Sequence, residues 1–160
     1  MTRNVLSFTI GILLASVAAG GASAQFIEKK TINLATAKKL AAAAETEAAK
    51  NSWNMVITVV DDGGNLVYTE RMDGAQIASI QISQGKAHTA LAFRRPTKDL
   101  QDAVTKGNTS ILKLDPVTPV QGGLPIVVDG KIIGAIGVSG AQSAQDEQCA
   151  QAGLNALSEK

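Results

Sequence analysis

The 160-residue sequence has one cysteine, one histidine and few aromatic residues, which make up 3% of the chain. A single cysteine, Cys149, cannot form an intramolecular disulfide, so the domain has to be held by its core or by oligomerisation. With aromatic residues scarce and alanine abundant, we expect closely packed helices rather than a thick aromatic core. The chain also has no large excess of either charge, because it contains 15 Lys and Arg and 14 Asp and Glu. We therefore expect neither nucleic acid nor an anionic membrane as a partner.

Standard enzyme signatures are absent as well. The sequence contains no G-x-S-x-G, Walker A loop, H-E-x-x-H or C-x-x-C. The glycines of residues 134–140 lack the spacing of a dinucleotide-binding loop, and we interpret them as positions where a helix lies close to a sheet. The aspartates at 61, 62, 73 and 129 stand in predicted turns, so we do not interpret them as a metal cluster.

The first 24 residues have the pattern of a cleavable secretory signal. Arg3 precedes an apolar run over residues 5–20, and Ala22-Ser23-Ala24 supplies small residues of the A-x-A type. The alternative is a membrane-anchoring helix, which needs about 20 apolar residues, whereas this run is shorter and ends in two glycines. We predict cleavage after Ala24, a single domain over residues 25–160, and export to the periplasm or the extracellular space.

Hydrophobic periodicity and turn residues predict the order helix, hairpin, two helices, hairpin, helix. The first helix runs from its N-cap Asn33 to Lys50, and the first hairpin pairs residues 55–60 with 66–72. Helices follow at 75–95 and at 97–106, and Thr97 caps the second of them. Residues 108–121 are then predicted to form a loop with room for one short strand. The second hairpin pairs 126–128 with 131–138, and the last helix begins at Ser143, with Asp146 completing a capping box. Tight turns join antiparallel strands, so the order predicts a two-layer or three-layer α/β sandwich.

His88 is the candidate ligand-binding residue. On the predicted helix its side chain leans over the preceding turn, above Gly85, where no side chain would obstruct it. Arg95 would lie on the same face about 10 Å away. The imidazole could then ligate a porphyrin iron while the guanidinium pairs with a propionate; Lys86 and Arg94 are further cationic candidates. The alternative is a solvent-exposed or interfacial histidine without a ligand.

Two other side chains leave their roles open. Tyr68 is either half-buried or at the edge of a pocket. Cys149 is interpreted as a buried free thiol that packs as a small apolar group, rather than as a ligand or redox switch.

Five short motifs stand in order along residues 59–140. They are Val59-Val60-Asp61-x-x-Gly64-x-Leu66, Arg71-Met72-Asp73-Gly74-Ala75, Lys86-Ala87-x-Thr89-Ala90, Gly122-Gly123-x-Pro125-Ile126 and Gly134-Ala135-Ile136-Gly137-Val138-Ser139-Gly140. Together, though not singly, they resemble the GlcG/HbpS family of haem-binding-like proteins, and also the C-terminal domain of PduO-type proteins.

The resemblance implies an α/β (α+β) fold of the profilin-like or PAS-like kind, in which helices flank a five-stranded antiparallel sheet. It also implies haem as a cofactor and an even-numbered homo-oligomer, up to an octamer. The family's ligand region looks like the helix that carries residues 86–90. The candidate cofactor contacts are therefore Lys86, His88 and Thr89 from this region and Arg95 from the helix spacing, with His88 as the candidate metal ligand.

Three functions are compatible with these features. The first is an exported, oligomeric haem-binding or tetrapyrrole-binding protein in haem handling or redox sensing. The second is an enzyme-like auxiliary acting on haem or on a small 2-hydroxy or keto acid, for which no carboxylate pair or nucleophile has a suitable spacing. The third is an extracytoplasmic accessory of a membrane sensor. Export favours haem or redox roles over cytoplasmic glycolate or corrinoid chemistry.

Overall fold

The computed structural model describes residues 27–158, and the predicted secretory signal and its cleavage site lie outside them. The chain forms the predicted order of elements, with one 3-10 helix added. The elements are α1 (Leu34–Lys50), β1 (Val56–Asp61), β2 (Leu66–Arg71), α2 (Ala78–Phe93), α3 (Thr97–Thr105), η1 (Thr109–Lys113), β3 (Gly123–Val128), β4 (Lys131–Ser139) and α4 (Ser143–Asn155). No helix in the described range is long and apolar enough to cross a bilayer.

The strands form one antiparallel sheet in the order β2-β1-β4-β3. Both predicted hairpins are present, and they join along β1 and β4, where Thr58 pairs with Gly137. The resemblance implied a five-stranded sheet, and this expectation is wrong for residues 27–158, which contain four strands. The segment with room for a further strand holds η1 and two prolines, Pro116 and Pro119, which lack the N–H that a strand ladder needs.

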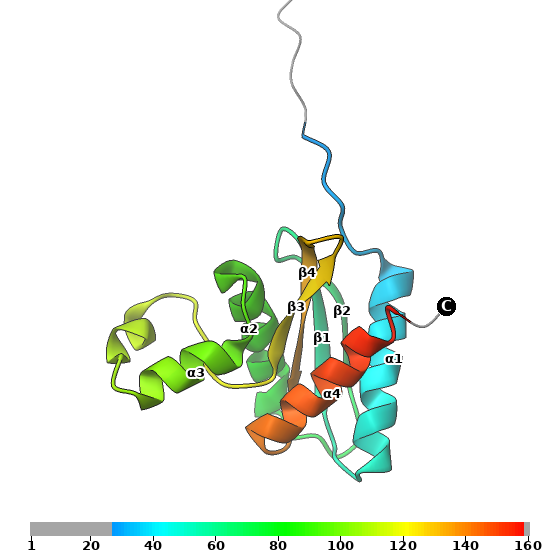
Figure 1. Cartoon of the computed structure of the whole chain (residues 1–160). Helices are drawn as coiled ribbons and strands as arrows, with labels where there is room; N and C mark the ends of the chain where they lie inside the picture. The colour runs from blue at the N-terminus through cyan, green and yellow to red at the C-terminus, as the bar shows by residue number, and fades with distance from the viewer. Residues whose placement is uncertain (1–26, 159–160) are drawn as a thin grey trace, which may run out of the picture.

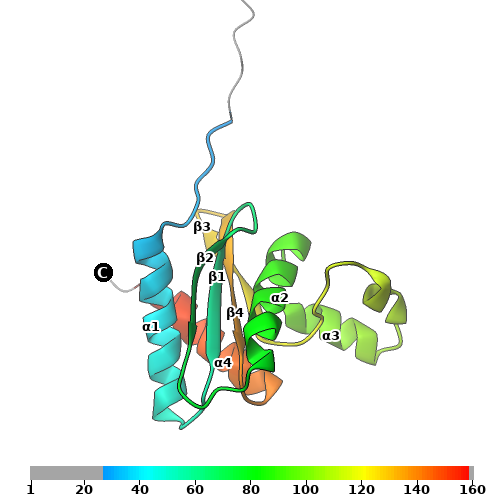
Figure 2. The ribbon, with the colours of Figure 1, turned by 180° about the vertical axis from the view of Figure 1, so that it is seen from behind.

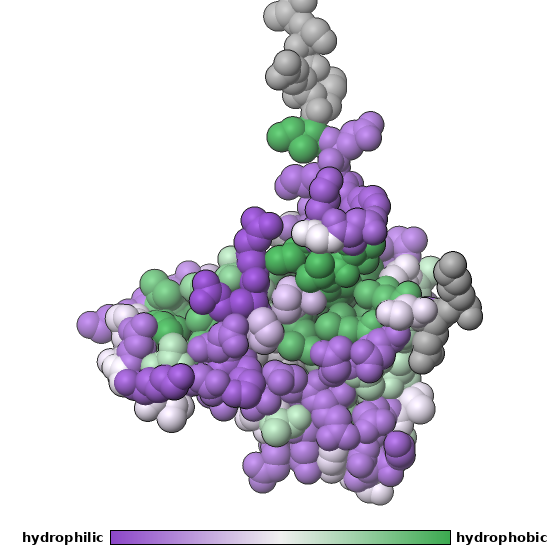
Figure 3. Space-filling view, viewed as in Figure 1, coloured by the Kyte–Doolittle hydropathy of each residue, from purple (hydrophilic) through white to green (hydrophobic). Residues whose placement is uncertain are grey.

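The sheet stands between two helical layers, so the predicted sandwich has three layers. Helix α2 covers one face, while α1 and α4 cover the other, as both views show (Figures 1 and 2). Helix α3 and η1 extend to the side of the domain (Figure 1). In the same view, a hydrophobic area lies over α1, α4 and the β3–β4 hairpin, within a largely polar surface (Figure 3).

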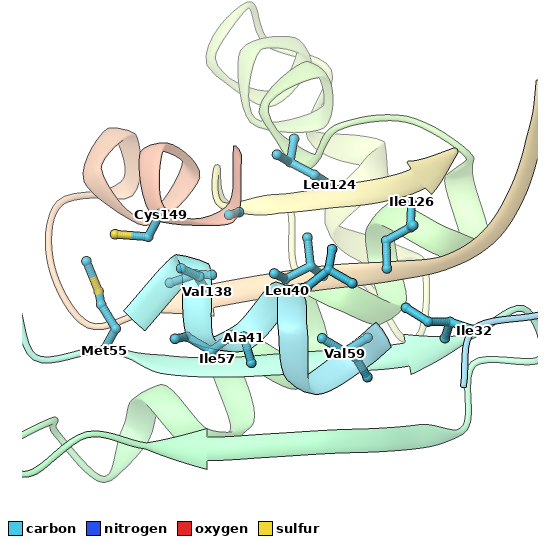
Figure 4. Packing of buried hydrophobic residues seen from close by; sticks show 14 of the residues in the cluster. Ile32, Leu40, Ala41, Met55, Ile57, Val59, Leu124, Ile126, Val138 and Cys149 are labelled. Carbon is cyan, nitrogen blue, oxygen red and sulfur yellow. The ribbon is translucent and has the colours of Figure 1, made fainter. Parts of the chain in front are cut away.

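The main core fills the space between the sheet and the α1–α4 layer. Leu40 of α1 packs there with Ile57 of β1 and Val138 of β4, all fully buried (Figure 4). Four alanines of α1, at residues 37, 41, 44 and 48, are buried in this core, whereas Leu34 at the start of the helix is half exposed. This layer therefore gives the domain its hydrophobic stability.

Helix α2 lies against the sheet through small residues. A Cβ on Gly137 would clash with the Ser83 carbonyl oxygen and stand 2.5 Å from the Ala87 nitrogen. The hydroxyls of Thr58 and Ser83 form a hydrogen bond of 2.8 Å across the same contact. The interpretation of the glycines in residues 134–140 as close-approach positions is thus confirmed at Gly137.

The helix ends agree with the sequence prediction at α1 and differ at α3 and α4. The Thr36 N–H donates to Asn33 Oδ1 at 2.8 Å, which confirms the N-cap. The Thr97 hydroxyl makes no cap hydrogen bond and instead accepts from the Gly123 N–H at 2.9 Å, because β3 runs past it. At α4 the capping box joins Gln142 and Gln145, not Ser143 and Asp146. Asp146 is drawn into the interior by the ion pair described below.

Candidate functional site

His88 lies on the exposed side of α2 and lines two neighbouring hollows. The larger has a volume of about 630 Å³ and the smaller about 230 Å³. Small-molecule sites usually span about 300–1,000 Å³, so the larger hollow has room for a ligand of that class.

The His88 imidazole packs on Gly64, in the turn between β1 and β2. A Cβ on Gly64 would stand 2.8 Å from Cε1 and 3.4 Å from both ring nitrogens, so only glycine leaves room for the ring. Gly64 also has a φ of 83°, which other residues rarely adopt. The vacant space predicted above Gly85 is not there, because the Thr118 side chain covers that position.

Four segments surround the larger hollow. They are the end of α2, the β1–β2 turn, the β3–β4 turn with the start of β4, and residues 27–30 before α1. The lining combines apolar groups, four cations and two acids: Ile27, Leu91, Ala92 and Ile132; Lys29, Lys30, Arg94 and Lys131; Glu28 and Asp62. Such a lining suits a ligand that is largely apolar and carries negative groups at its edge.

Two of the four cations already have partners. Lys29 Nζ lies 3.8 Å from Asp62 Oδ2, and Lys30 Nζ lies 2.6 Å from Asp129 Oδ2. Arg94 and Lys131 form no ion pair within the described range 27–158. These two cations are therefore available to an anionic ligand.

Arg95 does not occupy the predicted position. Helix α2 ends at Phe93, and Arg94 turns the chain with a left-handed φ of 55°. Arg95 is consequently displaced from the helix face, and its Nε donates to the Phe93 carbonyl at 3.2 Å. Arg94, the further cationic candidate, lines the larger hollow, and Arg95 lines neither.

Lys86 and Thr89 point away from His88. The Lys86 side chain is 1% exposed, and its ammonium contacts Asp146 Oδ2 at 2.6 Å and donates to the Val138 carbonyl at 3.0 Å. Burial lowers the pKa of the Lys86 ammonium even though Asp146 opposes that effect. Thr89 is also buried and accepts from the Thr118 N–H at 2.8 Å. The structure thus brings both residues into the packing of α2, not into either hollow.

The two open cases, Tyr68 and Cys149, lie away from the hollows. Tyr68 is half-buried, and its hydroxyl donates to Glu70 Oε2 at 2.8 Å, a hydrogen bond that raises the pKa of the phenol. Cys149 is fully buried within the main core, as predicted, and burial raises the pKa of its thiol to about 12.

The Cys149 thiol is expected to be unreactive in the folded protein, because the thiolate is the reacting species and burial disfavours it. With a chromogenic disulfide at pH 8, we expect labelling on the order of a hundredfold slower than in denaturant. Equal rates in the two states would contradict the burial of this side chain.

Sequence reasoning missed the walls that face His88. Gly64 stands in a turn, Lys131 begins β4 and residues 27–30 precede α1, so only the fold brings them to α2. The one available signal was the Gly64 position in the first motif, where a glycine follows Asp61 at fixed spacing.

Comparisons with known proteins agree with the predicted resemblance. The family model described as haem-degrading, HbpS-like protein matches residues 32–155. Protein GlcG of Escherichia coli K12 is 46% identical over 103 residues, which are 64% of this chain and 77% of GlcG. A crystal structure of a Streptomyces reticuli HbpS double mutant is 33% identical, with a TM-score of 0.78 over 91% of this chain and 98% of that one. A crystal structure of PduOC in complex with haem is 30% identical, with a TM-score of 0.72 over 79% and 94%. The chain therefore belongs to the HbpS-like family.

Proposed function

We propose that this protein binds haem or a related tetrapyrrole in the larger hollow, with His88 as the residue that would hold the iron. The observation that carries the proposal is an exposed imidazole, held against Gly64, at the wall of a hollow of about 630 Å³. Within residues 27–158 the imidazole has no hydrogen-bond partner or ion pair, so its nitrogens are free to ligate. The family and the haem complex of a relative support the same class of ligand.

The side chains around His88 fit the chemistry of haem. A neutral imidazole is a common axial ligand of haem iron. Leu91 and Ile132 offer apolar contact to a macrocycle, and Arg94 and Lys131 offer charge-assisted hydrogen bonds to carboxylates. When bound, haem would supply redox and ligand-exchange chemistry, while the chain binds it, orients it and limits its access to water.

A haemin titration of the purified processed protein tests this proposal. We expect a saturable shift of the Soret band in the wild type and at least a tenfold weaker affinity in His88→Ala, which is about 1.4 kcal/mol. Gln81→Ala is the control, because Gln81 lines only the smaller hollow. Equal affinities of the wild type and His88→Ala would remove His88 from the role of ligand.

Haem degradation is a second candidate, favoured by the description of the family model. Incubation of the haemin-loaded protein with a reductant in the presence of dioxygen, the oxidant that opening of the macrocycle requires, separates the two functions. Retention of the Soret band indicates storage or transport, whereas its loss with a linear tetrapyrrole product indicates degradation.

The setting of this activity is part of the proposal. The A-x-A pattern before residue 25 supports export, and haem handling or redox sensing outside the cytoplasm is the role that export favours.

The hydrophobic area over α1, α4 and the β3–β4 hairpin supports an even-numbered homo-oligomer (Figure 3). An accessory role with a membrane sensor is tested by co-purification from the native compartment.

A further inference from the structure

Residues 27–30 form an extended arm that leaves the domain beside the two hairpin turns (Figure 1). The base of the arm is fixed. The Ile32 side chain is 5% exposed within the main core, and its N–H donates to the Ile133 carbonyl of β4 at 3.2 Å. The arm itself lines the larger hollow, on the side that faces the end of α2. Its position at the wall of the hollow makes it a candidate ligand contact.

Two exposed ion pairs hold the arm to the hairpin turns. Lys29 reaches Asp62 in the first turn and Lys30 reaches Asp129 in the second, and the lysine side chains are 70% and 61% exposed. Ion pairs at this exposure contribute little to stability and are screened by salt. The arm is therefore free to exchange these partners for others at small cost.

Ile27 is the apolar residue of the arm. It is 85% exposed although it lines the hollow, whose apolar lining also includes Leu91 and Ile132. A flat apolar ligand in the hollow would offer Ile27 a surface on which to lose contact with water. Anionic groups on such a ligand would attract Lys29 and Lys30 in competition with their present aspartates.

We propose that residues 27–30 close over an anionic, largely apolar ligand in the larger hollow. Ile27 then packs on the face of the ligand, and Lys29 and Lys30 exchange Asp62 and Asp129 for its negative groups. The arm thereby sets how long the ligand stays bound and favours ligands with carboxylates. This inference rests on the proposed function, because it needs a ligand of that kind in the hollow.

The rate at which bound haemin dissociates into an excess of a high-affinity haem scavenger tests the arm. We expect Ile27→Ser to release haemin about three- to tenfold faster than the wild type, because the apolar contact is lost. The matched control is Ile77→Ser, an equally apolar residue that is 77% exposed and lines neither hollow. The control should release haemin at the wild-type rate.

Limited digestion with trypsin gives a second readout that does not depend on the rate of release. Trypsin cleaves after Lys29 and Lys30 in the arm, and after the exposed Lys106 as an internal reference. We expect haemin to slow cleavage in the arm several-fold and to leave cleavage after Lys106 unchanged.

The two proposals fail in different ways. If the wild type shows no saturable haemin binding, the proposed function is contradicted and the arm has no such ligand to cover. If haemin binds, but Ile27→Ser releases it at the wild-type rate and cleavage in the arm is unchanged, the arm proposal alone is overturned.

Discussion

Asp146→Ala is expected to lower the free energy of unfolding by about 3–5 kcal/mol, because it leaves the Lys86 ammonium buried without its partner. The two side chains are 1% and 3% exposed, so water does not screen the loss. Asp146 also accepts from the Ala141 N–H at 3.1 Å, ahead of α4. One substitution thus removes both the link between α2 and α4 and a support of the loop before α4. Chemical denaturation measures the effect.

Two comparisons show whether burial causes this loss. Asp102→Ala breaks the Lys98–Asp102 pair, which has the same separation of 2.6 Å but side chains 45% and 44% exposed. We expect that variant to lose less than about 1 kcal/mol. Replacing both members of the buried pair, with Lys86→Met and Asp146→Leu, should restore most of the stability. An Asp146→Ala protein as stable as Asp102→Ala would contradict the interior position of Lys86.

Gly137→Ala has the second large expected effect, a loss of about 1–3 kcal/mol or more from overpacking. The added Cβ would meet backbone atoms of Ser83 and Ala87 in α2, and backbone cannot rotate away as a side chain can. Helix α2 would have to move from the sheet and carry His88 away from Gly64. We therefore expect weaker haemin binding together with the lower stability, measured by denaturation and by Soret titration.

Gly63→Ala serves as the control for this substitution. A Cβ there would lie 2.9 Å from Asn65 Nδ2 and 3.3 Å from Asp61 Oδ1, both of which are side-chain atoms able to shift. We expect a loss of stability well below that of Gly137→Ala. Equal losses of stability in the two variants would mean that Gly137 is not needed for the close contact of α2 with β4.

The hairpins, α1 and the layered fold were predictable because their signals are local. Asp129 and Gly130 both adopt positive φ, 50° and 72°, as a short hairpin turn of this composition requires. Asn33 caps α1 through a side chain three residues from its donor. The number of strands was not predictable from the resemblance. It depends on the prolines after η1, which lack the N–H that a further strand would need.

Lys86 shows why the position of a predicted site residue could not be derived from the sequence alone. Periodicity places Lys86 on a helix beside His88, but its partner Asp146 is 60 residues away, and only the packing of α4 brings the two together. The position of Arg95 differs from the prediction for another reason, because the left-handed turn at Arg94 ends α2 before the helical spacing can apply. His88 needed neither a distant partner nor an exact helix end, and the structure places it at the wall of a hollow.

The proposed ligation of haem iron by His88 can be tested with the absorption spectrum of haemin-loaded His88→Ala, recorded with and without added imidazole. We predict that the variant alone lacks the wild-type Soret band and that free imidazole restores it, since free imidazole can replace the missing ligand. The wild type should change little on the same addition. If His88→Ala without imidazole gives the same spectrum as the wild type, His88 does not ligate the iron.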